Sequence, residues 1–230
     1  MIYSIISLLL CIWLSWHVSA HVNFFYPTWY EVLDINETIQ ETMPRHLYKR
    51  EFIETDTFEH HRLFGEMVVA VQNNGKGLEQ IVFYDPNSIP LGKLLTKSEI
   101  IHLQDVSNLI ASLNWISLAL IVICLLILAS IVFYRISMPA LKTIIAGTIA
   151  IVCALGLVVL IVGAKKLFYW LHTIIFPKNH QWFFYYEESL MSMLMKAPEL
   201  FGPVSLQLLF FGIVIWVLQL MLIRALIKLV

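Results

Sequence analysis

Three long runs without charged side chains constrain this sequence more than any other feature. They cover residues 113–133, 143–164 and 200–223. Each is at least the roughly 20 residues that a helix needs to cross the hydrocarbon core of a bilayer. A fourth apolar segment begins the chain. With their flanking residues, we place the spans at residues 1–20, 112–134, 140–164 and 203–223. The sequence therefore predicts a multi-pass membrane protein.

The composition and the charge distribution agree with this class. Hydrophobic residues make up 59% of the chain and charged residues only 13%, whereas about 25% of a soluble domain is charged. The net charge of −1 hides an acidic segment, residues 21–111, which holds 13 acidic and 7 basic side chains and so carries −6. An acidic exposed part without a basic cluster argues against nucleic acid as a partner.

The N-terminal segment and the cysteines carry weaker signals. Residues 1–16 are apolar and lack a basic start, so we favour a retained span, although residues 18–20 (VSA) resemble a signal-peptidase site. All three cysteines fall inside apolar runs. They show no disulfide framework or metal-ligand spacing, and we expect them to be small buried side chains.

The three glycines of the third span, at positions 147, 156 and 163, are expected to allow close helix packing.

Residues 21–111 are expected to form a small mixed α+β domain. Helical periodicity covers residues 58–72 and ends at the turn signal 73–75, and residues 78–84 are a strand candidate. The aromatic cluster 24–30 is expected to lie at the membrane interface. His60 and His61 are adjacent, and we interpret them as surface residues in preference to metal ligands. The predicted fold class is a mainly α membrane protein with four transmembrane helices and a small mixed α+β extracytoplasmic domain.

The orientation of the spans is set by the acidic segment. The basic residues near the helix ends divide evenly between the two sides, so they do not decide the topology. Because the first span behaves like an export signal, we expect residues 21–111 to be extracytoplasmic. The even number of spans then places residues 165–202 on the same side, as a loop with interfacial helices.

One long helix is predicted to lead from water into the membrane. Thr96 and Glu99 have the spacing of a capping box, and no Gly or Pro follows until Pro139. On the polar part of this helix Glu99, His102 and Asp105 recur every three residues along one side. A histidine flanked by carboxylates above a bilayer is a candidate for chemistry.

A second histidine is expected at the same height. Residues 165–176 can continue the third helix and contain His172. If Ser137 is the middle of the preceding turn, His102 and His172 each lie 35 residues from it. Two histidines can divide the roles of base and acid. Zinc is the competing use, with His102, Asp105, His172 and His180 as ligands, but no compact zinc motif is present.

An aromatic segment follows the second histidine. Five aromatic residues run from position 182 to 186, which suits a membrane interface or a groove for an acyl chain. We take Trp182, Tyr185 and Tyr186 as candidate substrate contacts. Glu187 and Glu188 follow, and either could orient a histidine.

Two stretches resemble a known family. Residues 99–106 (EIIHLQDV) and residues 171–201 (LHTIIFP, HQWFFYY, LM, APELF) are similar to the bacterial integral-membrane family that includes lipoprotein intramolecular transacylase. The resemblance implies four spans, with His102 and His172 as the two family histidines and Glu99 and Asp105 as supporting residues. Family members often have Asp-Pro in the aromatic segment, where this chain has Tyr185-Tyr186-Glu187-Glu188.

The resemblance also implies a reaction. The substrate would be a bacterial lipoprotein whose N-terminal cysteine carries a diacylglyceryl group, and the sn-2 acyl chain would move to the α-amine of that cysteine. No cofactor is expected. We favour His102 as base and His172 as acid, although the sequence does not decide the order of the two roles. The reaction would take place at the extracytoplasmic face of the bacterial cytoplasmic membrane, with the lipid bilayer as surroundings. A non-catalytic membrane assembly protein and a metal-dependent lipid hydrolase remain alternatives.

Overall fold

The structure is a computed structural model that describes residues 2–137 and 139–227. Contacts divide the chain into two compact units. The membrane unit comprises Met1–Val18, Ser112–Leu167 and Ser205–Val230, and the polar unit comprises Ser19–Ala111 and Phe168–Val204. Each unit is described by itself below.

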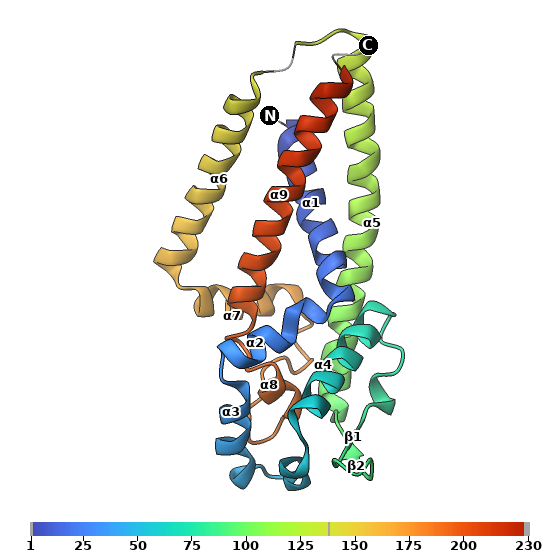
Figure 1. Cartoon of the computed structure of the whole chain (residues 1–230), viewed down its shortest axis with the longest axis vertical. Helices are drawn as coiled ribbons and strands as arrows, with labels where there is room; N and C mark the ends of the chain where they lie inside the picture. The colour runs from blue at the N-terminus through green and yellow to red at the C-terminus, as the bar shows by residue number, and fades with distance from the viewer. Residues whose placement is uncertain (1, 138, 228–230) are drawn as a thin grey trace. The chain divides into compact units, whose positions relative to one another are not determined.

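Four helices in the described part of the chain are long and apolar enough to cross a membrane. They are α1 (Ile2–His21), α5 (Lys97–Phe133), α6 (Leu141–Val162) and α9 (Phe201–Ile227) (Figure 1). These helices, together with a small two-stranded sheet, confirm the predicted fold class of a mainly α membrane protein.

Helix α5 is the predicted continuous helix. Its 37 residues correspond to about 55 Å, well beyond the roughly 30 Å of a bilayer core. The capping box is present at its start, because Thr96 N–H donates to Glu99 Oε2 (2.5 Å) and Glu99 N–H donates to Thr96 Oγ1 (3.4 Å). Residues up to Ala111 belong to the polar unit, and the apolar remainder belongs to the membrane unit.

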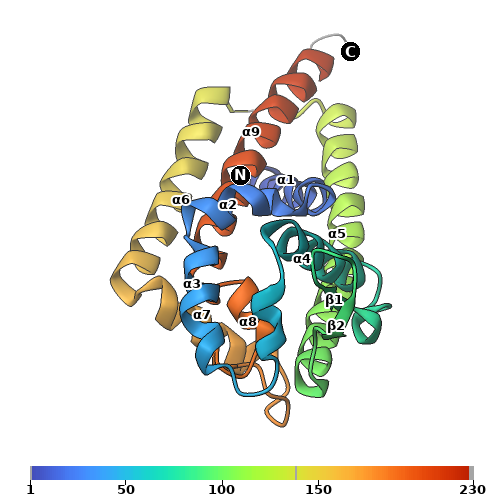
Figure 2. The same cartoon turned by 60° about the horizontal axis from the view of Figure 1, so that its bottom comes forward.

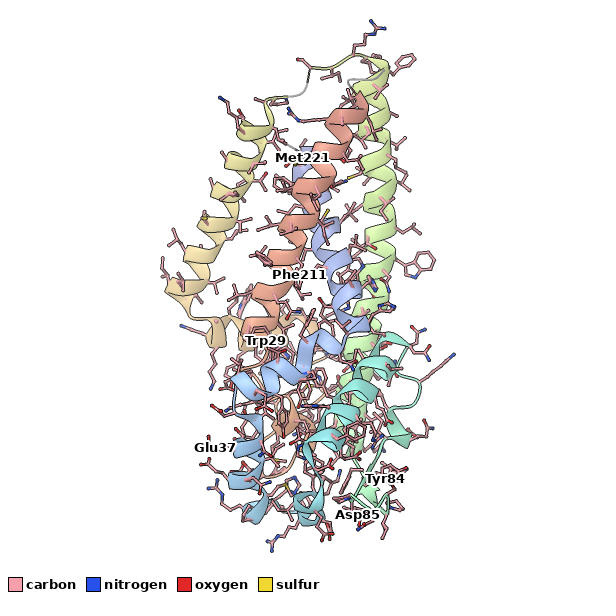
Figure 3. The ribbon with its side chains drawn as sticks, viewed as in Figure 1. Trp29, Glu37, Tyr84, Asp85, Phe211 and Met221 are labelled. Atoms are coloured by element: carbon pink, nitrogen blue, oxygen red, sulfur yellow. The ribbon has the colours of Figure 1, made fainter. Side chains whose placement is uncertain are left out.

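Helices α1 and α9 pack closely in the membrane unit. Trp216 is fully buried, and its Nε1–H is shared between the Ser4 carbonyl (3.1 Å) and Ser7 Oγ (3.2 Å). A Cβ at Gly212 would lie 2.9 Å from Ile12 Cα, so only glycine allows this approach. Met221, labelled on α9 in Figure 3, instead lies on an exposed apolar face.

Two expectations about this unit are wrong. No described atom lies within 4 Å of a Cβ built at Gly156, so this glycine does not serve close helix packing in the chain. Cys153, also on α6, is exposed, whereas Cys11 and Cys124 are buried as expected. Helix α6 therefore presents both positions outward, and an apolar sequence did not distinguish an outward face from an inward one.

The polar unit is a helical cluster with one hairpin. Its elements are α2 (Tyr26–Val32), α3 (Ile35–Thr42), α4 (Thr57–Gln72), α8 (Leu190–Leu194), the polar part of α5, and most of α7 (Ala164–Ile175). Strands β1 (Val82–Tyr84) and β2 (Pro90–Lys93) pair antiparallel. Short 3₁₀ segments cover Asn23–Phe25, Met43–Arg45, Arg50–Glu54 and Leu78–Gln80. Figure 2 shows α3 beside α8, and α4 beside the hairpin.

The predicted elements of this unit are confirmed in part. Helix α4 matches the predicted helix, and Asp56 caps it by accepting from Glu59 N–H at 2.8 Å. The predicted turn follows, with Gly75 at φ +77°. The predicted strand is correct only at its end, because its first residues form a 3₁₀ turn. Tyr84 and Asp85, labelled in Figure 3, mark where the hairpin turns.

Part of the aromatic cluster 24–30 lies in the core and not in the predicted interfacial belt, whereas Phe25 is exposed. Tyr26 and Tyr30 are each only 1% exposed. The Tyr26 ring stacks on Phe64 with centroids 3.8 Å apart, and its hydroxyl donates to the Leu194 carbonyl at 2.6 Å. These rings belong to the core of the polar unit, because helices α2, α4 and α8 converge on them.

His60 is a core residue, which corrects its interpretation as a surface histidine. Thr55 Oγ1 donates to the Phe52 carbonyl and therefore accepts from His60 Nε2–H at 2.7 Å. The Tyr30 hydroxyl lies 2.7 Å from His60 Nδ1 and 3.3 Å from Asn36 Oδ1, so both acceptors are within reach of its proton. Burial lowers the pKa of His60 to about 4. This satisfied neutral imidazole is structural.

Candidate active site

His102 lies in an aromatic environment on the polar part of α5. Its side chain is buried, and its centroid is 5.0 Å from that of Phe176, 6.0 Å from that of Phe184 and 6.1 Å from that of His172. Among the described residues, its Nδ1 has no hydrogen-bond partner. Burial and, to a smaller extent, the nearby His172 lower the pKa of His102 to about 4, while Asp105 opposes the shift. The ring is therefore neutral at pH 7.

His172 approaches from helix α7. Its Nδ1–H donates to the Phe168 carbonyl one helical turn earlier, at 2.8 Å. This bond fixes the tautomer and leaves Nε2 with a free lone pair. Burial lowers the pKa of His172, and the bond to Phe168 partly opposes that shift. The rings of Phe168, Trp182 and Phe176 surround it at 4.0, 5.1 and 5.1 Å between centroids.

The two histidines meet, but not by the predicted route. The third span does not run on to His172, because α6 ends at Val162 and α7 begins at Ala164. Gly163 between them has φ +90°, a conformation that only glycine adopts readily. The prediction that the two histidines lie at the same height, 35 residues on each side of a turn, assumed that both helices are continuous. Packing within the polar unit is what brings the rings to 6.1 Å.

The hydrogen bonds of the Glu99 carboxylate go to Thr96 and Ser189 and not to His102, although Glu99 lies one turn before it. The carboxylate is fully buried, and each oxygen has its own partner. One oxygen completes the capping box with Thr96 N–H. The other accepts a hydrogen bond from the Ser189 hydroxyl.

Asp105 is likewise bonded elsewhere. Its Oδ2 lies 2.7 Å from His180 Nδ1, and both side chains are mostly buried. Its charge still reaches His102, where it favours the protonated ring. Both carboxylates predicted to flank His102 therefore bind residues of the segment 180–189 instead.

The three predicted aromatic contacts are placed differently from one another. Trp182 lies against His172 and also near Tyr169 (5.9 Å between centroids). Tyr185 is 62% exposed and contacts the exposed Phe183. The Tyr186 hydroxyl hydrogen-bonds the Ala197 carbonyl and Glu199, within its own loop. Only Trp182 lies beside a histidine.

The zinc alternative would use His102, Asp105, His172 and His180 as one ligand set. Across the described part of the chain, no group of three or more His, Cys, Asp or Glu side chains is arranged to hold a metal ion. In this structure the four side chains form two separate pairs, Asp105 with His180 and His102 with His172.

Sequence reasoning missed Phe176, Phe184 and Ser189. A signal for Phe184 was available in the aromatic run. In an extended chain alternate residues face the same way, and here positions 182, 184 and 186 face inward while 181, 183 and 185 are exposed. Reading the run with a period of two would have separated its inner rings from its outer ones.

Comparisons with known proteins relate the chain to one family and one solved structure. The model of the family described as "Lipoprotein intramolecular transacylase Lit" matches residues 1–201. A solved structure of Lit from Bacillus cereus, membrane-integral and carrying a histidine-to-arginine substitution, is 17% identical with a TM-score of 0.61. The match covers 99% of this chain and 91% of that one. At this identity the likeness shows a shared fold.

No curated protein sequence matches the chain. The family model, however, spans 201 of the 230 residues and includes both histidines and the aromatic segment. The chain therefore belongs to the lipoprotein intramolecular transacylase family of multi-pass bacterial membrane proteins, and it is an acyltransferase.

Proposed function

We propose that the chain moves the sn-2 acyl group of a diacylglyceryl-modified lipoprotein to the α-amine of the same N-terminal cysteine. The observation that carries this proposal is the pairing of the buried His102 with the half-buried His172, whose ring centroids are 6.1 Å apart and which have aromatic rings around them. Nucleophile and ester belong to one molecule, so the enzyme has to position them and to handle one proton.

The proton balance of the transfer is simple. The neutral α-amine attacks the ester carbonyl, and a C–N bond forms. The bond between the acyl carbon and the sn-2 oxygen then breaks. The amine loses one proton and the departing glyceryl oxygen gains one. No oxidant, enzyme nucleophile or second substrate is needed, and the products are an amide and a free sn-2 hydroxyl.

His172 is the base in this mechanism. The bond from its Nδ1–H to the Phe168 carbonyl leaves the Nε2 lone pair available and keeps the ring oriented. The same bond favours the protonated ring, which helps His172 to hold a proton taken from the amine. The proton is returned to the glyceryl oxygen, so the histidine ends the cycle unchanged.

His102 then supplies a hydrogen bond rather than a titrating proton. Because burial makes it a neutral ring, it offers one N–H, and a neutral imidazole can stabilise a developing oxyanion. This assignment reverses the base and acid roles that the sequence favoured. The charge of His172 disfavours a second proton on His102, so the pair carries at most one.

The aromatic surroundings suit this chemistry. The rings of Phe176, Trp182 and Phe184 place apolar surface beside the histidines, and apolar surface disfavours water. Excluding water favours attack by the amine over hydrolysis of the ester. We further propose that the site faces the outer side of the cytoplasmic membrane, where the substrate carries its lipid anchor.

Mass spectrometry tests the reaction directly. Purified protein is incubated with a diacylated lipopeptide, and the product is fragmented. We expect an unchanged total mass and a fragment in which the cysteine α-amine carries the acyl chain. His102→Ala and His172→Ala should each abolish the shift, whereas the exposed histidine variant His21→Ala should not.

Other outcomes would contradict the proposal in distinct ways. Loss of one fatty acid from the lipopeptide would identify a hydrolase. Gain of a labelled chain from added phospholipid would identify an intermolecular acyltransferase. Unchanged lipopeptide, with protein that is folded by its melting profile, would argue for a different substrate.

A further inference from the structure

The segment 180–189 has no regular secondary structure, yet it is tied to α5 near both of its ends. At one end His180 Nδ1 bonds Asp105 Oδ2 at 2.7 Å. At the other end the Ser189 hydroxyl donates to Glu99 Oε1. The two carboxylates lie three residues before and three residues after His102. These two hydrogen bonds, called the ties below, therefore flank the histidine on the helix.

Ser189 is fixed on both sides of its hydroxyl. Its Oγ accepts from Ser192 N–H at 3.0 Å, which caps helix α8, while it donates to the buried Glu99. Glu99 in turn completes the capping box of α5. One tie therefore joins the starts of two helices.

Between the ties the segment presents two rings to the histidines. Trp182 lies 5.1 Å from His172 and Phe184 lies 6.0 Å from His102, measured between ring centroids. The intervening Phe183 and Tyr185 face outward. A further backbone bond, from Leu47 N–H to the Glu187 carbonyl at 2.8 Å, supports the end nearer Ser189.

We propose that Glu99 and Asp105 are positioning residues that hold residues 180–189 as a strap over His102 and His172, and that the strap makes the acyl ester react with the substrate amine instead of water. This inference rests on the function proposed above. The motif of Glu, His and Asp at three-residue spacing then has one reacting member and two anchors.

Loosening the strap has a specific chemical consequence. Water would reach the ester carbonyl, its oxygen would bond to the acyl carbon, and the bond to the sn-2 oxygen would break. A free fatty acid and a glyceryl hydroxyl would result, with no acyl chain on the amine. The ratio of transferred to hydrolysed product therefore measures whether the strap is held in place. A general loss of folded protein would leave that ratio unchanged.

Three variants separate anchoring from electrostatics. Asp105→Ala removes both the bond to His180 and the charge near His102. His180→Ala removes the bond and keeps the charge. Asp105→Asn removes the charge and keeps an oxygen that can accept from His180. If Asp105 is an anchor, Asp105→Ala and His180→Ala should behave alike, and Asp105→Asn should resemble the wild type.

The experiment measures hydrogen exchange and product partition on the full-length protein in detergent. In Asp105→Ala and His180→Ala we expect exchange in residues 180–189 to rise about tenfold, and the transfer-to-hydrolysis ratio to fall about tenfold. Ser189→Ala, which removes the bond to Glu99, should likewise raise the exchange and lower the transfer-to-hydrolysis ratio. Gln104→Ala is the matched control, because Gln104 neighbours Asp105 on α5 but bonds the Asn74 carbonyl in a different loop.

The outcomes decide between the two roles. A slow Asp105→Asn enzyme beside an unaffected His180→Ala enzyme, with normal exchange in both, would overturn anchoring in favour of a charge effect. Unchanged exchange in Asp105→Ala and in Ser189→Ala would also overturn it. Hydrogen exchange in residues 180–189 can be measured without any reaction. If the wild-type protein shows no transfer activity, the proposed function is contradicted, and the exchange data still test whether the strap is anchored.

Discussion

Identical side chains have different properties in this protein because their surroundings differ. His60 has a hydrogen-bond partner for each ring nitrogen, and both partners are buried. His172 has a partner for Nδ1 only, and the Nδ1 of His102 has none among the described residues. Buried polar atoms are normally satisfied, and exceptions gather where function needs them. Unused bonding capacity therefore distinguishes His102 and His172 from His60. His46 Nε2 and His61 Nε2 also have no partner among the described residues, so the candidate pair is identified by the 6.1 Å between its ring centroids as well.

The assignment of roles predicts unequal losses in glutamine variants. Glutamine can donate a hydrogen bond but cannot exchange a proton in the manner of imidazole. We expect His172→Gln to lose roughly 10²-fold or more in kcat, since it removes the base. We expect His102→Gln to lose only about tenfold, because it retains a donor. Single-turnover rates with a diacylated lipopeptide measure both. A greater loss in His102→Gln would restore the roles that the sequence favoured.

The pH dependence should follow the substrate and not the enzyme. Burial lowers the pKa of both histidines, that of His102 to about 4, so His102 stays neutral as pH falls from 8 to 5 and His172 takes up a proton at a lower pH than an ordinary histidine does. The substrate α-amine, with an ordinary pKa of about 7.7–8.0, is instead protonated over this range. We expect kcat/KM to rise with pH up to about 8.

A change of substrate checks this assignment. A lipopeptide with a less basic α-amine should move the acid limb of kcat/KM to lower pH by the difference in amine pKa. If the acid limb of kcat/KM stays near pH 6.5 with every amine, a histidine with an ordinary pKa controls the rate.

At the scale of elements, α5 and the interruption after α6 organise the site. Helix α5 is continuous, so a single helix contains both a candidate membrane span and the motif around His102. The chain from α6 bends at Gly163, and α7 starts anew with His172 in its last turn. No residue of α7 is buried, and Trp170 and Ile174 are largely exposed. The predicted location of this helix at the membrane interface stays a prediction, one that such a surface suits.

Two glycines provide a matched test of helix packing in the membrane unit. Gly212→Ala places a methyl group 2.6 Å from Ile12 Cγ1 and 2.9 Å from its Cα, so α1 and α9 must separate. Overpacking of this kind costs about 1–3 kcal/mol, and we expect a lower Tm in detergent.

Gly156→Ala is the control. No described atom lies within 4 Å of its Cβ, and alanine favours a helix by about 1 kcal/mol over glycine. An equal fall in Tm for both variants would contradict the assignment of Gly212 to the helix contact.

At the scale of the whole molecule, the open question is on which side of the membrane the histidines lie. The four candidate spans give both ends of the chain the same side, and residues 21–111 and 165–202 the other. We expect those two segments to be extracytoplasmic.

Reporter fusions measure this topology. A reporter active only in the cytoplasm should work after residue 230 and fail when inserted within residues 72–77. The reverse pattern would invert the topology and place the reaction on the cytoplasmic face.

The sequence by itself determined the class of the protein and its four candidate spans, and it predicted which residues form the candidate site. Uncharged runs of about 20 residues have few alternatives to a membrane helix, because a bilayer leaves no partner for an unpaired backbone. The capping box at Thr96 and Glu99 and the absence of Gly or Pro before Pro139 predicted α5 as one helix, and the structure confirms it. Such features depend on residues near one another in the chain.

Only the tertiary structure decided what each of these residues touches. Glu99, Asp105 and His102 share one side of a helix, yet the carboxylates bind Ser189 and His180, about 75–90 residues away. Tyr26 and Trp182 come from similar aromatic clusters, but one is core and the other lies beside His172. Helical spacing fixes direction along a single element. The residue that a side chain meets in that direction belongs to another element, and the packing of the whole unit decides which residue it is.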